Sequence, residues 1–163
     1  MEIRTRKGSL ILVDETDHAW LSALTWSVSS TGYAVRNEWR SGKQRTVLMH
    51  RLLLGLQPGD RCDVDHINGN RLDNRRVNLR VCTRSQNLWN ARGMNGRSGL
   101  KGVSWHATSK KWRARMTTEK GVHRHLGVFD TPELANEFYT LAVQMVHGEF
   151  AYQNGGDHQI PRP

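Results

Sequence analysis

The chain has 163 residues and carries 24 Lys and Arg against 15 Asp and Glu, a formal net charge of +9 at pH 7. This length suits one or two small domains, and 37% apolar residues with six Trp are enough to build a core, which excludes the weakly hydrophobic class of disordered proteins. No apolar run approaches the ~20 residues of a membrane span, and two cysteines are too few for a disulfide framework, so we expect a protein of the cytoplasm.

The first sixty residues predict β-strands that form a scaffold. Ser9–Val13 is a short apolar run, and two β-rich stretches follow, Tyr33–Trp39 and Gln44–Leu53. Arg40-Ser41-Gly42-Lys43 between them is typical of a hairpin turn. We expect His50, on the second stretch, to pack or to brace a loop rather than to act in catalysis.

Residues 62–92 predict the order strand, loop, strand, helix. The strands are Cys62–Ile67 and about Asn78–Cys82, and a capped helix runs from there to Arg92. We therefore assign residues 1–92 to one domain that ends with this unit.

Positive charge is concentrated in the middle of the chain. Residues 71–128 hold fourteen basic and two acidic side chains, a net charge of +12, whereas 129–163 hold one basic and five acidic. Such a field attracts a polyanion, usually nucleic acid, with an affinity that falls as salt rises. Along the first domain and the basic linker 93–101, the side chains expected to contact phosphates are Arg71, Arg75, Arg76, Arg80, Arg84, Arg92, Arg97 and Lys101.

Residues 102–152 predict a three-stranded antiparallel sheet covered by one helix. In Lys111–Thr117 apolar and mostly basic residues alternate, so one face of this strand is apolar and the other basic. Flanking strands are expected within 102–106 and 122–129. A helix opens after Thr131, and the positions expected to cover the apolar face of the sheet are Leu134, Phe138, Leu141, Ala142 and Met145.

Four polar residues have the spacing of a known nuclease motif. Asp65 and His66 are neighbours, Asn78 follows twelve positions after His66, and Asn87 follows nine positions later on the predicted helix. This pattern resembles the HNH nuclease motif in its His-Asn-Asn form, found in phage and intron-associated homing endonucleases, and LMHRLLLG resembles that family's lead-in. The resemblance implies a ββα-metal fold with His66 as general base and Asn78 bracing the loop that holds it. It also implies that Asp65 and Asn87 are metal ligands.

The chemistry of phosphodiester cleavage explains these residue types. Hydrolysis needs a nucleophilic water, relief of phosphate charge and stabilisation of the departing oxygen. A neutral imidazole takes a proton from water near neutral pH, and oxygen ligands from Asp and Asn suit Mg²⁺ or Mn²⁺. Because neighbours on a regular strand point to opposite faces, Asp65 and His66 serve one phosphate only if the strand ends or distorts there.

A second resemblance covers about residues 99–152. GVSWHATSKKWRARM, HRHLGVFDTPELANEFY and HGEFA are similar to the DNA-binding domain of plant ethylene-response factors, whose three-stranded sheet enters the major groove. Trp112 is expected in the core, because it alternates with the arginines. His106 and Ala107 replace basic residues of the plant pattern, so its base preference does not carry over. The resemblance implies DNA contacts from Trp105, His106, Lys111, Arg113, Arg115, Arg124 and His125.

Together these features predict an α+β, two-domain endonuclease of homing type that acts on double-stranded DNA. Its parts are domain 1–92, linker 93–101, domain 102–152 and a frayed tail, 153–163. A monomer with one site should nick one strand per engagement and leave 5′-phosphate and 3′-hydroxyl ends, as the family implies, in the cytoplasm of a bacterial host if the gene is phage-borne. Two alternatives stay open: a non-catalytic DNA-binding regulator, and a protein that binds or cleaves RNA.

Overall fold

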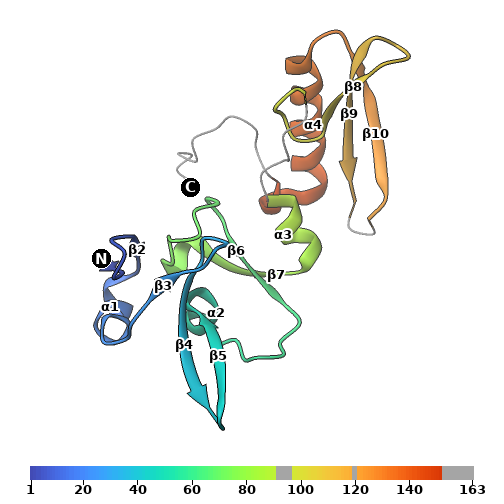
Figure 1. The fold of residues 1–163 in the computed structure, drawn as a ribbon. Coiled ribbons are helices and arrows are strands. Elements are labelled where there is room, and N and C mark those ends of the chain that lie inside the picture. Colours follow the sequence, from blue (N-terminus) through green and yellow to red (C-terminus); the bar gives the residue numbers. More distant parts are fainter. Residues whose placement is uncertain (91–96, 119–120, 152–163) are drawn as a thin grey trace. The chain divides into compact units, whose positions relative to one another are not determined.

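A computed structural model describes residues 1–90, 97–118 and 121–151 (Figure 1). The chain divides into two compact units, Met1–Thr83 and a second unit that begins at Arg84. Within the described residues, the first unit holds three small sheets and the second holds one, so the protein is a mixed α and β structure. Each unit has a hydrophobic cluster of its own. No helix among the described residues is both long and apolar enough to cross a membrane.

The first unit begins with a short hairpin and a helix. Strands β1 (Glu2–Arg4) and β2 (Leu10–Leu12) pair antiparallel, and α1 (Glu15–Ser22) follows. The second sheet has the order β3-β4-β5, formed by Ser27–Val28, Ala34–Arg40 and Lys43–Leu48.

The predicted hairpin turn between β4 and β5 is confirmed. Arg40 pairs with Lys43, and Ser41 and Gly42 between them have φ of 52° and 72°. Two successive positive φ values are those of a tight turn that matches strand twist. The prediction of a strand through residue 53 is wrong, because β5 ends at Leu48 and helix α2 (Met49–Leu53) follows.

The reason for this helix is the spacing of its buried residues. Met49 and Leu53 are four positions apart, so one helical turn places both in the core, where alternation along a strand would also bury the charged Arg51 between them. His50 is buried on the same helix.

The third sheet is the ribbon of β6 (Asp63–His66) and β7 (Leu79–Cys82), which pair antiparallel. A 3₁₀ turn, η1 (Arg76–Asn78), leads directly into β7, so Asn78 lies just before the strand rather than in it. Val64 and Leu79 anchor the ribbon in the core of the first unit.

The second unit contains the predicted sheet and helix, together with α3 (Arg84–Asn90). The sheet has the order β10-β9-β8, and all its pairs are antiparallel. Its elements are β8 (Val103–His106), β9 (Lys111–Thr117), β10 (His123–Phe129), α4 (Pro132–His147) and the turn η2 (Gly148–Phe150). Arg92 and the predicted tail, 153–163, lie outside the described residues.

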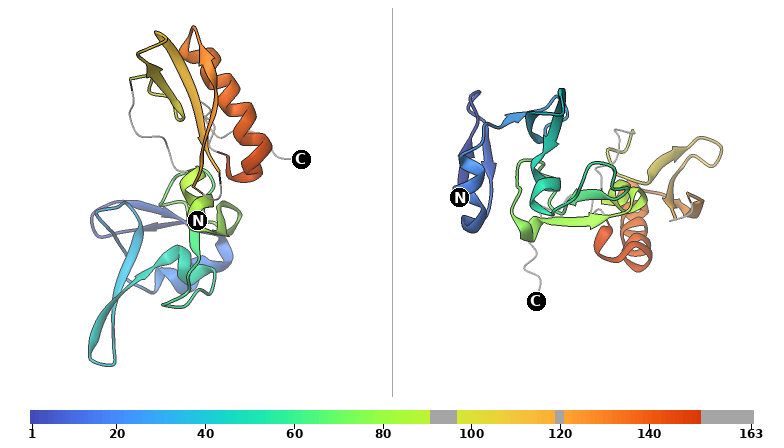
Figure 2. Two further views of the ribbon diagram at one scale, coloured as in Figure 1. Left: turned by 90° about the vertical axis from the view of Figure 1, so that its right-hand side faces the viewer. Right: turned by 90° about the horizontal axis from the view of Figure 1, so that it is seen from below.

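Helix α4 lies along the sheet (Figure 2) and begins as the sequence predicts. The Thr131 hydroxyl accepts from the Leu134 N–H at 3.2 Å, and Pro132 occupies the first turn. Its buried face is different from the predicted one: Ala135, Tyr139 and Val143 meet the sheet.

Most of the predicted core stripe of α4 is exposed instead. Only Ala142 of that set packs against the core, whereas Leu134, Phe138, Leu141 and Met145 remain 41–87% exposed. Helix α4 has two apolar faces. Which of them packs on the sheet is determined by close packing at Gly102, which has φ +75°. A Cβ at this position would overlap the Tyr139 ring, so the absence of a side chain draws the Tyr139 face onto the sheet.

Candidate active site

His66 stands at the end of the β6–β7 ribbon. The register pairs His66 with Leu79 and Asp65 with Arg80, so the two neighbours point to opposite faces of the ribbon. The strand ends at His66, and a turn closes there with Gly69 N–H donating to the His66 carbonyl at 2.8 Å. Both side chains are buried, with 4% exposure each.

Two aromatic rings enclose the His66 imidazole. The centroid of His50 lies 5.1 Å from that of His66 in an edge-on arrangement, and Tyr33 lies 5.9 Å from His66 and 5.1 Å from His50. Arg71 stacks over the Tyr33 ring at 4.7 Å. Sequence reasoning missed Tyr33, because it stands 33 positions before His66 and nothing in the motif's spacing points to it.

Burial keeps these two histidines neutral. It lowers the pKa of His66 below the ordinary 6.5, although a side-chain hydrogen bond with Asn74 and the charge of Asp65 act to raise it. Burial and the neighbouring His66 lower the pKa of His50 to about 3. His66 is therefore an imidazole able to accept a proton at neutral pH.

Asn78 ties together the loop that follows His66. Its Nδ2 donates to the Asp73 carbonyl at 2.8 Å, and its Oδ1 accepts from the Asn68 N–H at 3.0 Å. Its own carbonyl accepts from the Ile67 N–H at 2.9 Å. These contacts fasten both ends of loop 67–73 to one buried residue.

Asp65 is engaged by the arginine opposite it. Arg80 donates to Asp65 Oδ2 from Nε at 2.8 Å and from Nη2 at 2.6 Å; the Asp65 side chain is buried, and that of Arg80 is 10% exposed. The described residues contain no group of three or more His, Cys, Asp or Glu side chains that could hold a metal. A metal at Asp65 would therefore need amide, phosphate or water oxygens as further ligands.

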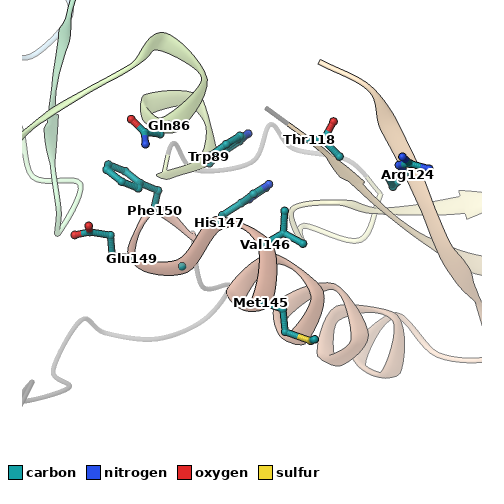
Figure 3. Close-up of a pocket in the computed structure, with 10 residues that line it drawn as sticks. Gln86, Trp89, Thr118, Arg124, Met145, Val146, His147, Glu149 and Phe150 are labelled. Atoms are coloured by element: carbon teal, nitrogen blue, oxygen red, sulfur yellow. The ribbon is translucent and has the colours of Figure 1, made fainter. Parts of the chain in front are cut away.

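Asn87, the other expected ligand, lies on α3 in the second unit. The Trp89 ring stacks on His147 of α4 with centroids 3.9 Å apart and an interplanar angle of 1°, and Lys101 Nζ donates to the carbonyls of Leu88 and Trp89. Figure 3 shows Trp89 and His147 side by side in a pocket of about 750 Å³. These contacts explain why α3 belongs to the second unit, where the sequence had grouped it with the strands before it.

Four arginines predicted to contact phosphates are held by groups of the first unit. Arg75 forms a bidentate ion pair with Asp73, with hydrogen bonds of 2.8 and 2.6 Å. Arg76 forms a bidentate ion pair with Asp17, with hydrogen bonds of 2.7 and 2.9 Å. Arg71 donates to the Thr31 carbonyl, and Arg80 is held by Asp65. The net charge of residues 71–128 did not reveal these ion pairs, because Asp17 and Asp65 both lie outside that segment.

The second unit presents a basic sheet face. Cross-strand partners share a face, and the register pairs Arg113 with Ser104, Lys111 with His106, and Arg115 with His125. These five predicted contact residues therefore lie together on the face opposite α4: His106, Lys111, Arg113, Arg115 and His125.

Two predicted contact residues do not lie on that face. Trp105 pairs with Trp112, and Arg124 pairs with Met116, which places both on the face of the buried Ala114. The prediction carried these positions over from the resemblance, whereas a one-residue step along a strand changes the face. Trp112 packs against the core as predicted.

The remaining predicted contacts have separate places. Arg84 begins α3, and Lys101 caps its end, where burial lowers the Lys101 pKa to about 8. Arg97 stacks over the Trp105 ring at 5.7 Å.

Comparison with known proteins points to one family. A family model described as HNH endonuclease matches residues 47–88. An uncharacterized HNH endonuclease of Acanthamoeba polyphaga mimivirus is 26% identical over 148 residues, which cover 91% of this chain and 76% of that protein. Protein 3.8 of Escherichia phage T7 is 35% identical over 89 residues, which cover 54% of this chain and 72% of that protein.

A solved structure is also similar: the HNH homing endonuclease I-HmuI, with 18% sequence identity, a TM-score of 0.37, and coverage of 83% of this chain and 71% of that one. The segment matched by the family model contains Asp65, His66, Asn78 and Asn87. The chain belongs to the HNH endonuclease family, and it is a DNA endonuclease.

Proposed function

We propose that this endonuclease hydrolyses a phosphodiester of double-stranded DNA with His66 as the general base. The observation that carries the proposal is the setting of His66: a buried imidazole of lowered pKa, enclosed by Tyr33 and His50, at the start of a loop fastened by Asn78. A base held in this way is neutral and fixed in place before the substrate arrives.

In the proposed reaction His66 removes a proton from the attacking water. The water oxygen forms a bond to phosphorus, and the bond between phosphorus and the 3′ oxygen breaks. The departing 3′ oxygen takes up a proton, so the products are a 5′-phosphate and a 3′-hydroxyl. Asn78 acts on this step through the loop, by keeping His66 in position.

The donors that the motif implies, a carboxylate and an amide oxygen, suit a divalent metal, Mg²⁺ or Mn²⁺. The Asp65 carboxylate and the Asn87 amide would hold it, since both offer the hard oxygen atoms that such ions prefer. When bound, it would relieve charge on the phosphate. Asp65 Oδ2 accepts from two N–H groups of Arg80, so the metal would share this carboxylate with the guanidinium or displace it.

The basic face of the second unit is the proposed reader of DNA. Arg113 and Arg115 lie on β9 on the face away from α4. Arginine is the commonest partner of guanine in the major groove, and Lys111 would position the duplex through phosphate. With one His66 per chain, one copy acting alone as a monomer nicks one strand per engagement.

The test is incubation of the protein with supercoiled plasmid and Mg²⁺, with His66→Ala compared with His18→Ala. His18 is a histidine of α1 that contacts only the Glu2 carbonyl among the described residues, so its variant should cut like the parent. His66→Ala should lose cleavage by a factor of roughly 10² or more and keep its affinity for DNA in a gel-shift assay. Open circles before linear product would support nicking.

Equal losses of binding and cleavage in His66→Ala would instead make His66 a structural residue. Binding without cleavage in the parent, on any DNA, would favour a non-catalytic regulator. Cleavage of a matched RNA at a comparable rate would overturn DNA as the preferred substrate.

A further inference from the structure

Helix α4 carries an exposed apolar stripe that the described residues of its unit do not cover. The stripe is Leu134, Phe138, Leu141 and Met145, which are 41%, 48%, 54% and 87% exposed. From the helical repeat, it lies about a third of a turn around the axis from the buried face of Ala135, Tyr139 and Val143. Scattered exposed apolar residues are ordinary, but an ordered row along a 16-residue helix is the kind of surface that another surface can cover.

The spacing of the stripe is that of a helix pair. Its members are separated by four, three and four residues, which is the alternating pattern of a coiled-coil seam. The same series reads identically in both directions along the helix. In a two-fold antiparallel pair this symmetry places each stripe residue opposite another stripe residue, since residues at equal distances from the helix midpoint meet.

One residue of the stripe, Phe138, is already fixed on one side by a ring of its own unit. The Phe138 ring rests against Phe129 of β10, with centroids 4.7 Å apart, yet remains half exposed. A ring fixed on one side loses little freedom when its other side is covered.

Charge on the helix decides what can cover the stripe. Glu133 and Glu137 are both exposed on the amino-terminal half of α4. The helix has no Lys or Arg, and its one histidine, His147, is buried. DNA, a polyanion, is disfavoured on this side. An antiparallel second helix is favoured, because it would bring its carboxyl-terminal half, which has no acid from Phe138 to His147, against these glutamates.

We propose that the α4 stripe is the contact surface for a second copy of this chain. In the antiparallel arrangement Phe138 of one copy meets Leu141 of the other, and Leu134 meets Met145. Four side chains on a helix about 24 Å long cover less than the ~1,600 Å² of a standard interface, so the pair is weak and concentration-dependent. The monomer predicted from the sequence is then the dilute form.

Pairing would bring two HNH sites to one duplex, which supplies a route from nicking to a double-strand break. Two copies bound to neighbouring DNA sites would raise each other's local concentration. The contact itself does not depend on the role of His66.

Sedimentation velocity of the full chain, from low to high micromolar concentration, tests the stripe. The parent should shift from monomer to dimer, and Met145→Glu should raise the dissociation constant at least tenfold. Met145 is 87% exposed, so this variant should fold normally, and its thermal unfolding checks that. Trp39→Glu is the matched control: Trp39 is 76% exposed on β4, and its loss should leave the dissociation constant unchanged.

Cysteine cross-linking tests the direction of pairing. In a background where Cys62 is replaced by Ser, chains with Phe138→Cys are mixed with chains carrying Leu141→Cys. Mixed disulfide dimers should form faster than dimers of either variant alone. A parent that stays monomeric throughout, or a dimer that Met145→Glu does not weaken, would overturn the proposal. Loss of DNA affinity in Met145→Glu with no change in mass would show that DNA covers the stripe.

Discussion

At the scale of single residues, the carboxamide of Asn78 holds the loop next to His66 by satisfying groups at both of its ends. The Asn68 N–H and the Asp73 carbonyl each depend on it, at 3.0 and 2.8 Å. Asn78 is itself buried, so neither group has ready access to water in its place. In the proposed site, a residue that touches no reacting atom would act in this way, by holding the loop that follows His66.

Asn78→Ala should lower the free energy of unfolding by about 1–3 kcal/mol, because it leaves a buried donor and a buried acceptor unsatisfied. Urea unfolding followed by circular dichroism measures this change. Asn37→Ala is the control: its amide accepts an exposed hydrogen bond from Thr46 at 3.0 Å, and the loss there should be far smaller. Equal losses for the two variants would contradict the bracing role.

The buried His50 makes stability depend on pH. The unfolded chain binds a proton at His50 below about pH 6.5, whereas the folded chain does so only near 3, so the unfolded state holds more protons between these values. The free energy of unfolding should therefore fall on acidification by about 1.4 kcal/mol per pH unit for this group. His66, whose pKa is also lowered, adds to the loss.

His50→Gln removes the proton that the unfolded chain takes up at His50. The slope of unfolding free energy against pH, measured by urea titration below pH 6.5, should become shallower by up to one proton. A slope equal to that of the parent would mean that His50 is not neutral in the folded protein.

At the scale of elements, alternation along β9 separates a basic face from the core. Arg113 and Arg115 lie on one side, and Ala114 and Met116 on the other. The sequence predicted this strand with its observed bounds, because period-two alternation is a local property. Which residues of β8 and β10 join each face depends on register, and no local pattern determines it.

The difference between local signals and contacts of distant residues also explains which other features the sequence predicted. Local signals correctly predicted the β4–β5 turn and the start of α4 at Thr131, since turn and cap residues act on their neighbours. The contact face of α4 could not be predicted, because it depends on the meeting of Gly102 and Tyr139, 37 positions apart. The same holds for Tyr33 beside His66.

Arg115→Gln and Arg124→Gln form a matched pair that tests the faces. Arg115 is on the basic face, so its loss should weaken DNA binding and reduce the slope of log affinity against log salt by about 1. Arg124 lies on the other face, and its loss should change that slope much less. Fluorescence anisotropy with a labelled duplex measures both, and identical effects would contradict the assignment.

At the scale of the whole molecule, net charge overstates the positive charge available to DNA. Arg75, Arg76 and Arg80 are paired with carboxylates of the first unit, although they contribute to the +12 of residues 71–128. Within 71–128, most of the basic residues that are not paired with these carboxylates therefore lie after Thr83.

The salt dependence of DNA binding should follow this division. Affinity of the whole protein should fall steeply as salt rises, at about −0.9 in log–log slope per phosphate neutralised. Arg76→Gln should leave the slope near that of the parent, unlike Arg115→Gln, because Arg76 is held by Asp17. Anisotropy titrations at several salt concentrations measure the slopes, and a flat response in the parent would exclude phosphate contacts as the main source of affinity.

Gly102 limits how this chain can diversify. Its missing side chain leaves the space that the Tyr139 ring fills, and a Cβ there would also come within 2.8 Å of the Arg115 carbonyl. Gly99, three residues earlier, shares a positive φ but faces open space. In a saturation library selected for folded protein, position 102 should retain glycine almost exclusively, while position 99 admits asparagine and aspartate.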